Sequence, residues 1–586
     1  MKSSLRNTIF ASAASFGLSI GGALAQETDN SAAPLAPEQK QSEIINFVLK
    51  RASQMHPDAK SYVELSTMAY RELLEHLDED LSPEEITDKV LDAVLGSLDP
   101  HSSFTPAKDV QSSQENISGS FFGIGAVIGL DNSVSDGTTT PVMQHGLKIV
   151  KLIHDETPAA LAGVQQGDLI THVNDEPLAG KTITECVRLL KGPRGTEINA
   201  TIERSGERAP LILSITRDEV IISPVESEML ENNTGYIKLS QFSGQADHHI
   251  DLAIRDLNEQ GAERFILDLR SNLGGLVGQA DAIIENFISG DPALLEYWKR
   301  RDKERAQITI NAFKSAFRDE NNDLDEQKLK AFFRSISKEE LKNFVRFNRG
   351  QTKYASEVIT TLEKHNKIEH GAFSIPEQTE EERTLEANNT SISMRYIDGK
   401  RPQYFVTPGS ETDAPLVVLV NGHSASASEI TSGVLQNYKR ATIVGTQTFG
   451  KGSGYAQIPI DIDNDDVADG LMNLTTFYYY VGRGEGGNIQ GVGITPDVVL
   501  SSEFAAVSTQ TGWKREESLN AVLNRPEDAH YDVTSQYTCK PIEVSINPEA
   551  GDPWIQCGMA VLDGMQSDYV TLEPITQAPE ITPAVH

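Results

Sequence analysis

A run of small residues and serines at positions 420–430 carries the side chains best suited to covalent catalysis. An apolar strand ends there in Asn-Gly-His, and Ser424, Ser426 and Ser428 follow at alternate positions before a helical stretch. A hydroxyl at the start of a helix lies beside backbone N–H groups that can stabilise a nearby anion. On mechanism alone, Ser424 and Ser426 are both candidate nucleophiles, and we expect Ser428 to cap the helix.

A lysine flanked by glycines, Lys451, stands in the run GTQTFGKGSG at residues 445–454. Such a lysine is either simply exposed or held in place for chemistry. The run also imitates a phosphate-binding loop, but Gly452 occupies the position where Ser or Thr must bind magnesium. Residues 455–460 then alternate like a strand instead of opening a helix. We therefore reject nucleotide hydrolysis as the function.

Buried strands and a helix are expected around both stretches. Residues 416–420 are wholly apolar, which is typical of a parallel sheet covered on both faces. Further strands are expected at 264–269, 441–444 and 473–481, and residues 429–438 have a helical pattern. Alternation of strands and helices indicates an α/β layer, so this layer is the element that must position the serines and the lysine.

Residues 118–219 read as a β-rich module that resembles a PDZ domain. Its most specific part, residues 159–170, combines a short helix, a Gly turn and a Gly-Asp turn into a strand. In that family a Gly-rich loop, here Gly123, Ile124 and Gly125, offers backbone N–H groups to the C-terminal carboxylate of a peptide. The peptide adds as a strand beside this loop. The resemblance therefore implies recognition of protein C-termini.

Two further regions, 41–97 and 291–395, have apolar residues at helical spacing. The first is expected to be a scaffold or a dimer arm. Within the second, residues 291–370 hold 17 basic and 14 acidic side chains, a net charge of +3 in a chain of −34. This insertion is interpreted either as a solvated helical hairpin or as a lid or dock for an acidic surface.

No metal site or cofactor is predicted from the residue pattern. Residues 319–325 imitate the start of a calcium loop, but Leu324 replaces the required Gly and Lys330 replaces the bidentate Glu. The adjacent pair His248 and His249 does not have a metal-ligand spacing.

The net charge limits the possible partners of the protein, and the N-terminal residues indicate its cellular location. A net charge of −34 over 586 residues argues against nucleic acid or an anionic membrane as partner. Residues 1–25 combine a basic start, an uncharged small-apolar stretch and a small-x-small cleavage site, the pattern of a secretory signal peptide. We therefore expect export to the periplasm. In that oxidising compartment Cys539 and Cys557, 18 residues apart, can pair.

Five motifs resemble those of the carboxyl-terminal processing peptidases, the tail-specific proteases of family S41. They are LDPHSSF, LRSNLGG, NGHSASASEI, FGKGS with its following strand, and GITPDV. The resemblance covers about residues 40–505 except the insertion. It implies a crotonase-like core and a Ser–Lys dyad whose nucleophile lies 25 residues before the lysine, which selects Ser426 for Lys451. It also implies an oxyanion hole made by the N–H groups of Gly275 and Ala427.

The dyad is physically reasonable because burial disfavours the charged form of a lysine and can lower its pKa by several units. A neutral amine at Lys451 would then act as general base. The chain departs from the family four residues after the lysine, where many members have Gln and this chain has Tyr455. Gln457 lies two residues further on, on the same face of the strand as Tyr455. Either Tyr455 or Gln457 orients the Lys451 amine, or neither residue does. A Ser–His–Asp triad that uses His423 is a further alternative to the dyad.

The predicted function is a secreted serine endopeptidase that recognises protein substrates by accessible, apolar C-termini. An inactive PDZ adaptor is the alternative, and homo-oligomerisation and an activator or adaptor partner stay open. The fold class is multidomain α/β: a crotonase-like protease core with an inserted PDZ module, an N-terminal helical region and a helical insertion. The predicted order is signal peptide 1–25, linker 26–40, N-terminal helices 41–117, PDZ domain 118–219, core 220–290, insertion 291–395, core 396–505 and C-terminal region 506–586.

Overall fold

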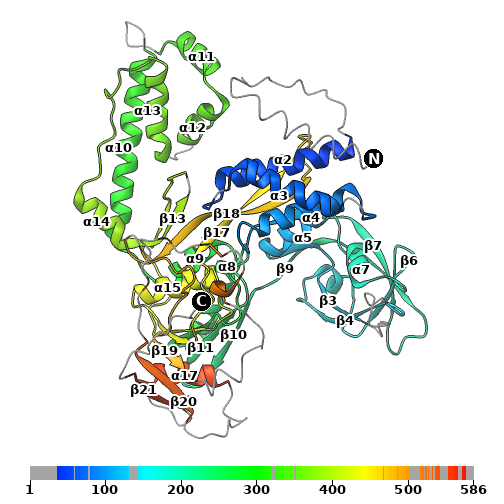
Figure 1. Ribbon diagram of the computed structural model, residues 1–586. Coiled ribbons are helices and arrows are strands. Elements are labelled where there is room, and N and C mark those ends of the chain that lie inside the picture. The colour runs from blue at the N-terminus through cyan, green and yellow to red at the C-terminus, as the bar shows by residue number, and fades with distance from the viewer. Residues whose placement is uncertain are drawn as a thin grey trace.

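The structure, a computed structural model, describes most of residues 36–575 (Figure 1). Within that range it leaves out residues 59, 77–78, 131–142, 319–323, 349–351, 397, 466, 485, 502–514, 520–521, 524–525, 527–530, 532–534, 542–551 and 565–569. The predicted signal peptide, most of the predicted linker and most of the calcium-like stretch therefore lie outside the described residues.

Three N-terminal helices pack on the rest of the protein: α2 (Pro37–Met55), α3 (Tyr62–Glu75) and α4 (Pro83–Gly96). Helix α2 begins inside the predicted 26–40 linker. The expected capping box at the start of α4 is confirmed, because Ser82 and Glu85 bond each other's backbone N–H groups. Apolar side chains of the three helices share one core with Ile460, Met472 and Leu474.

A PDZ-like sheet follows, attached through helix α5 (Ala107–Ser118) and a two-stranded ribbon of β2 (Ser120–Gly123) and β9 (Asp218–Ile221). Its strands run in the order β3-β4-β5-β7-β8, with β6 paired to β5, and helices α6 and α7 pack beside them. Their bounds are β3 (Ala126–Leu130), β4 (Leu147–Leu152), α6 (Pro158–Leu161), β5 (Leu169–Val173), β6 (Glu176–Pro177), α7 (Ile183–Leu190), β7 (Glu197–Glu203) and β8 (Leu211–Thr216). Strand β3 stands at one end of this order and β8 at the other.

The central layer is an eight-stranded sheet in the order β10-β11-β12-β15-β16-β19-β20-β21. The strands from β11 to β20 run parallel, as the apolar pattern predicted. Their bounds are β10 (Val225–Leu230), β11 (Thr234–Leu239), β12 (Arg264–Asp268), β15 (Leu416–Val420), β16 (Thr442–Gly445), β19 (Val498–Leu500), β20 (Tyr537–Pro541) and β21 (Val570–Pro574).

Both faces of this sheet are covered, which explains the unbroken apolar strands. Alternate side chains such as Leu267 and Val418 pack against α8 (Ala246–Glu259), α9 (Val277–Phe287) and α15 (Ala427–Asn437). The others, such as Ile266 and Val417, pack against α17 (Pro553–Leu562) on the opposite face.

A second sheet lies beside this layer and contributes the strand that follows Lys451. Its order is β1-β18-β13-β14, with β17 also paired to β18. The bounds are β1 (Ser103–Pro106), β13 (Thr390–Tyr396), β14 (Gln403–Phe405), β17 (Ser453–Ile460) and β18 (Gly470–Val481). The expected strands at 455–460 and 473–481 are therefore confirmed, with β18 beginning three residues earlier.

The insertion is helical and projects from the body of the molecule at the top left of Figure 1. It contains α10 (Pro292–Ala316), α11 (Glu326–Ser335), α12 (Lys338–Asn348), the 3₁₀ turn η1 (Thr352–Tyr354), α13 (Ala355–Lys364) and α14 (Glu380–Asn389). Its phenylalanines, among them Phe317, Phe332 and Phe344, pack with Val358 and Leu362 of α13 into a separate apolar core. Strand β13 begins at Thr390, so the core resumes before the predicted boundary at 396.

The C-terminal region completes the central sheet instead of forming a separate tail. Strands β20 and β21 add to the edge of β19, and a disulfide joins Cys539 of β20 to Cys557 of α17. The predicted pairing of these cysteines is thus confirmed. Cys186, on α7, is free and fully buried.

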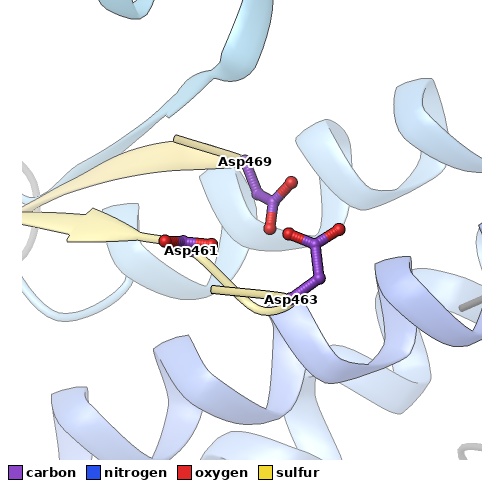
Figure 2. Close-up of side chains that lie close together, drawn as sticks. All are labelled: Asp461, Asp463 and Asp469. Atoms are coloured by element: carbon purple, nitrogen blue, oxygen red, sulfur yellow. The ribbon is translucent and has the colours of Figure 1, made fainter. Parts of the chain in front are cut away.

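Within the described residues, no helix combines the length and the apolar character needed to cross a bilayer. The part of the chain that the structure describes also holds one group of carboxylates close enough to share an ion, Asp461, Asp463 and Asp469 (Figure 2). Lys40 of α2 lies among them, with its Nζ 2.7 Å from Asp463 and 2.5 Å from Asp469. The group therefore ties α2 to the β17–β18 hairpin by ion pairs.

Candidate active site

The turn between β15 and α15 presents one of its three serines. Ser424 is fully buried, donating to the Leu269 carbonyl at 2.8 Å and accepting from the Asn421 amide at 3.0 Å. Ser428 is also fully buried, and its hydroxyl donates to the Asn272 carbonyl at 2.8 Å. Ser426 is partly exposed and occupies the N-cap position with a φ of +55°. The expectation that Ser428 caps the helix is therefore wrong; Ser426 stands there.

A glycine loop lies directly against this turn. A Cβ placed on Gly274 would come within 2.8 Å of the Ser426 Cβ and 2.9 Å of the Ala427 amide, so only glycine permits the approach. A Cβ on Gly275 would come within 2.3 Å of the Phe242 carbonyl. Ala427 is the first residue of α15, where a helix amide has no intrahelical partner. The predicted oxyanion residues Gly275 and Ala427 thus belong to adjoining segments.

Asn272 holds the glycine loop and the serine turn together, a role that the motif LRSNLGG did not reveal. Its fully buried side chain donates to the Leu239 carbonyl and accepts from the Gly274 amide, both at 2.8 Å. Its carbonyl accepts from the Ala425 amide at 3.0 Å, in addition to the Ser428 hydroxyl.

Lys451 lies between β16 and β17 and is only 9% exposed. Burial lowers the pKa of its amine below the ordinary 10.5, against the opposing effect of the Glu516, Asp99 and Glu429 carboxylates. Burial of Lys451 therefore acts in the direction that a general base requires.

Glu429, missed by the sequence analysis, connects the serine turn to the lysine loop. Its fully buried carboxylate accepts from the amides of Ser426 and Lys451 with the same oxygen, Oε2, at 2.9 Å each. The other oxygen, Oε1, accepts from the Thr448 hydroxyl at 2.5 Å and the Gly450 amide at 2.7 Å. Burial raises the pKa of this carboxyl to about 7, although all four hydrogen bonds oppose the shift. A charged residue in an apolar helical turn was the signal that could have identified it.

Tyr479 of β18 makes a second connection between the two segments. It is fully buried, its hydroxyl donates to the Lys451 carbonyl, and it also hydrogen-bonds the Ser426 side chain. Ser426 and Lys451 therefore have two shared neighbours, one carboxylate and one phenol.

Of the two residues considered for orienting the lysine, Tyr455 contacts it. The Lys451 Nζ lies 5.1 Å from the centroid of the Tyr455 ring. Gln457 is exposed on β17, and its amide donates to Asn473 at 3.0 Å. A bulge between Gly454 and Tyr455 interrupts the strand register. His423 lies three residues before Ser426, its amide donates to Asn421, and burial lowers the pKa of its imidazole.

The Gly-rich loop of the PDZ-like module joins β2 to β3. Gly123 ends β2, Ile124 is buried in the module's core, and Gly125 has a φ of +76°. A Cβ on Gly125 would lie within 2.5 Å of Thr157, so the turn requires glycine. In the part of the chain that the structure describes, β3 ends the strand order of its sheet, and the side chain of Val127 on this strand is 38% exposed.

Comparison with known proteins identifies two domain families in the chain. The Peptidase family S41 model matches residues 233–500, and a PDZ domain model matches residues 149–204. The chain is 30% identical over 422 residues to a carboxy-terminal-processing protease of Bartonella bacilliformis, covering 71% of this chain and 70% of that protein.

Two other proteins are also similar. One is a carboxy-terminal processing protease, CtpA, of Bacillus subtilis, which is 32% identical over 238 residues, or 40% of this chain and 48% of that protein. A solved structure of a photosystem II D1 C-terminal processing protease aligns with 79% of this chain and 94% of that chain, at 19% identity and a TM-score of 0.35. From its S41 and PDZ matches and its identity to the Bartonella protein, the chain belongs to the carboxy-terminal processing proteases of family S41, which are serine-type endopeptidases, and it carries a PDZ domain.

Proposed function

We propose that the protein cleaves protein substrates near their C-termini by a Ser–Lys dyad of Ser426 and Lys451 on a crotonase-like core. The observation that carries this proposal is the shared Glu429 oxygen, which holds the backbones of both residues at 2.9 Å while Lys451 is buried. Because the two amides bind one atom, the backbones of Ser426 and Lys451 stay together.

In the proposed reaction the neutral Lys451 amine removes the proton of the Ser426 hydroxyl as its oxygen attacks the scissile carbonyl. The Gly275 and Ala427 amides stabilise the tetrahedral oxyanion, each contributing about 2.7–4 kcal/mol. The intermediate collapses, and the leaving amine takes the proton from Lys451. Water then hydrolyses the acyl-enzyme by the same proton transfers in reverse. The Tyr455 ring, whose centroid lies 5.1 Å from the Lys451 Nζ, is proposed to orient this nitrogen and to stabilise it while it carries the proton.

We further propose that the PDZ domain recruits the substrate C-terminus. The loop at residues 123–125 would receive the carboxylate, and the chain would add to the edge of β3 beside Val127. An exposed apolar strand edge favours an apolar substrate tail. The family assignment does not favour the inactive adaptor alternative. Homo-oligomerisation and a protein activator stay predictions.

Export to the periplasm is part of the same proposal. The pairing of Cys539 with Cys557 supports it, because disulfides persist in oxidising compartments. The segment that would direct export, residues 1–25, lies outside the described residues.

The test compares Ser426→Ala and Lys451→Ala with the surface controls Ser410→Ala and Lys400→Ala, using a folded protein that ends in an apolar tail. We expect both dyad variants to lose cleavage while melting at the temperature of the wild type, and both controls to cleave normally. Cleavage by Lys451→Ala at the wild-type rate would refute the dyad. Amidation of the substrate C-terminus should weaken its binding to the Ser426→Ala protein, and unchanged binding would refute carboxylate recognition.

A further inference from the structure

A carboxylate from the C-terminal region lies in the interior beside the lysine loop. It belongs to Glu516, the first residue of the short 3₁₀ turn η2 (Glu516–Ser518), and it is fully buried. This residue lies beyond the 233–500 segment that matches the S41 model. A buried carboxylate is costly unless it is hydrogen-bonded, so its partners indicate what it supports.

Both oxygens of Glu516 bind side chains that come from distant parts of the chain. Oε1 accepts from the Gln490 amide at 2.8 Å, and Oε2 accepts from Nε2 of His101 at 2.7 Å. Gln490 is itself buried, and its Oε1 accepts from the Gly452 amide at 2.8 Å. Glu516 therefore reaches the backbone that directly follows Lys451 through a single intervening side chain.

The backbone and the neighbouring arginine hold the other side of the same loop. The Glu516 amide donates to the Phe449 carbonyl at 3.2 Å. Arg515 donates from Nε to the Thr448 carbonyl at 3.2 Å and from Nη2 to the Val492 carbonyl at 2.6 Å. Residues on both sides of Lys451 are thus fastened to the segment that contains Glu516.

We propose that Glu516 is a positioning residue for Lys451, acting with Gln490 and His101 in place of the glutamine that many family members have four residues after the lysine. The proposal rests on the Ser–Lys dyad proposed above. Tyr455 occupies the usual glutamine position and has no amide with which to hold the loop. The Glu516–Gln490–Gly452 series of hydrogen bonds supplies that restraint from the opposite direction.

Glu516 also acts on the charge of the lysine. Among the described residues, the carboxylates of Glu516, Asp99 and Glu429 act on the charge of Lys451, and the Tyr455 ring lies near its Nζ. The Tyr479 hydroxyl bonds the Lys451 carbonyl, His101 bonds Glu516, and His56 bonds Asp99. Among the charges, Glu516 acts most strongly on Lys451 in favour of its protonated form. Neutralising Glu516 therefore lowers the pKa of Lys451, and the acidic limb of the activity profile moves to lower pH.

The experiment compares wild type, Glu516→Gln, Glu516→Ala and the neighbouring exposed control Glu517→Gln, whose side chain is 54% exposed. For Glu516→Ala we expect kcat to fall by a factor on the order of ten to a hundred with little change in KM, because the base loses its support. Glu516→Gln keeps both hydrogen-bonding positions if His101 changes tautomer, so it should restore most of kcat and shift the acidic limb to lower pH. Glu517→Gln should match the wild type.

A wild-type kcat in Glu516→Ala, or an acidic limb that does not move in Glu516→Gln, would overturn the proposal. If Glu516→Ala fails to fold, Glu516→Gln decides by its pH profile.

A measurement without turnover separates this proposal from the dyad. In the Ser426→Ala background, the rate of Lys451 acetylation by acetic anhydride is followed against pH by mass spectrometry. We expect Glu516→Gln to shift this titration to lower pH. An unshifted titration would refute the role of Glu516 and leave the Ser–Lys dyad unaffected. Cleavage by Lys451→Ala would count against the dyad instead.

Discussion

The protease core and the helical insertion are organised in opposite ways. In the core, side chains from remote segments converge on the same few atoms: Glu429 holds the serine turn and the lysine loop, and Asn272 holds the glycine loop against the serine turn. In the insertion, the apolar residues of α10 to α13 pack mainly on one another. The core therefore depends on contacts across the whole chain, whereas the insertion depends on its own.

Substitutions should therefore cost more stability and activity in the core than in the insertion. A buried donor that loses its acceptor costs about 1–3 kcal/mol, and the core has several such donors on one carboxylate. The ion pairs of the insertion are largely exposed and are each worth about 0–1 kcal/mol. Matched substitutions in the two regions test this difference.

The largest effect is expected for Glu429→Gln. The amide NH2 group cannot accept a hydrogen bond, so two of the four donors on this side chain lose their partner. We expect the free energy of unfolding to fall by roughly 2–6 kcal/mol, at about 1–3 for each donor. We also expect kcat to fall on the order of a hundredfold, because either the Ser426 and Lys451 amides or the Thr448 and Gly450 donors of the lysine loop lose their acceptor. Urea unfolding and peptide hydrolysis measure the two effects.

The matched control in the insertion is Glu326→Gln, whose carboxylate pairs with Lys330 and is 70% exposed. It should leave both kcat and stability unchanged within error. If Glu429→Gln were as mild as this control, the view of the core as one connected hydrogen-bonded unit would be wrong.

Next in size is the loss of the disulfide that fastens the C-terminal strands to the core. Replacing Cys539 and Cys557 with Ser should lower the free energy of unfolding by about 3 kcal/mol, given the 18-residue separation. Thermal melting with and without dithiothreitol measures this effect. The reductant should destabilise the wild type and leave the double variant unchanged; a wild type that melts at the same temperature in both conditions would contradict the prediction.

A smaller effect, dependent on pH, is expected for Asp99→Asn. Burial alone would raise the pKa of Asp99, but hydrogen bonds from His56 and Ser102 outweigh it and lower the pKa from 3.8 to about 2. A depressed carboxyl pKa stabilises the folded state above pH 4, and this contribution is lost as the pH falls towards 2. Asp99→Asn should therefore cost roughly 2–3 kcal/mol at pH 6 and progressively less below pH 4.

The counterpart in the insertion is Glu340, whose pKa is also lowered to about 2, by the Ser337 amide and then by Lys364. Solvent surrounds this group more closely, so Glu340→Gln should cost less than about 1 kcal/mol at pH 6. Urea unfolding at several pH values compares the pair. Equal costs would mean that burial does not distinguish the two regions.

The smallest effect is expected from removing the distal insertion. Deleting residues 303–374 and closing the gap with a short Gly-Ser linker removes its separate apolar core, while α14 and the proposed catalytic residues stay. We expect hydrolysis of a short peptide to stay within about twofold of the wild type, since distant sites act independently. Loss of hydrolysis in a deletion variant whose core still melts normally would show that the insertion takes part in the reaction.

The sequence indicated those site residues that belong to short local motifs. It did not indicate the residues whose hydrogen-bond partners lie far away in the chain. The strand-to-helix turn and the glycine-flanked lysine are local patterns, and they left Ser424 and Ser426 as candidate nucleophiles beside Lys451. The family resemblance then selected Ser426, which is partly exposed, whereas Ser424 is fully buried. The expectation for Ser428 was wrong because its hydroxyl finds a carbonyl in another segment, at Asn272. The charge of Glu429 in an apolar turn could have marked it as unusual, but its partners could not be predicted, because its four donors become neighbours only after the sheet has formed.

The same reason applies to the outer parts of the fold. The pattern of buried strands predicted the parallel layer, but it did not show that β20 and β21 would complete its edge. Strands at an edge need only one apolar face and resemble ordinary loop-flanked segments. Likewise, the motif LDPHSSF pointed to the family without revealing that His101 bonds a glutamate more than 400 residues later.

The pairing of β12 with β15 has a consequence for how the chain folds. These neighbours at the centre of the sheet are joined by α9 and the whole insertion, so their contact closes a very long loop. The entropic cost of closing a loop grows only slowly with its length, by about 0.6 kcal/mol for each doubling. The insertion therefore lowers the free energy of unfolding only slightly. The rate is more sensitive, because contacts between remote segments slow folding. An insertion that collapses early on its own phenylalanine core would draw the two strands together and shorten the search.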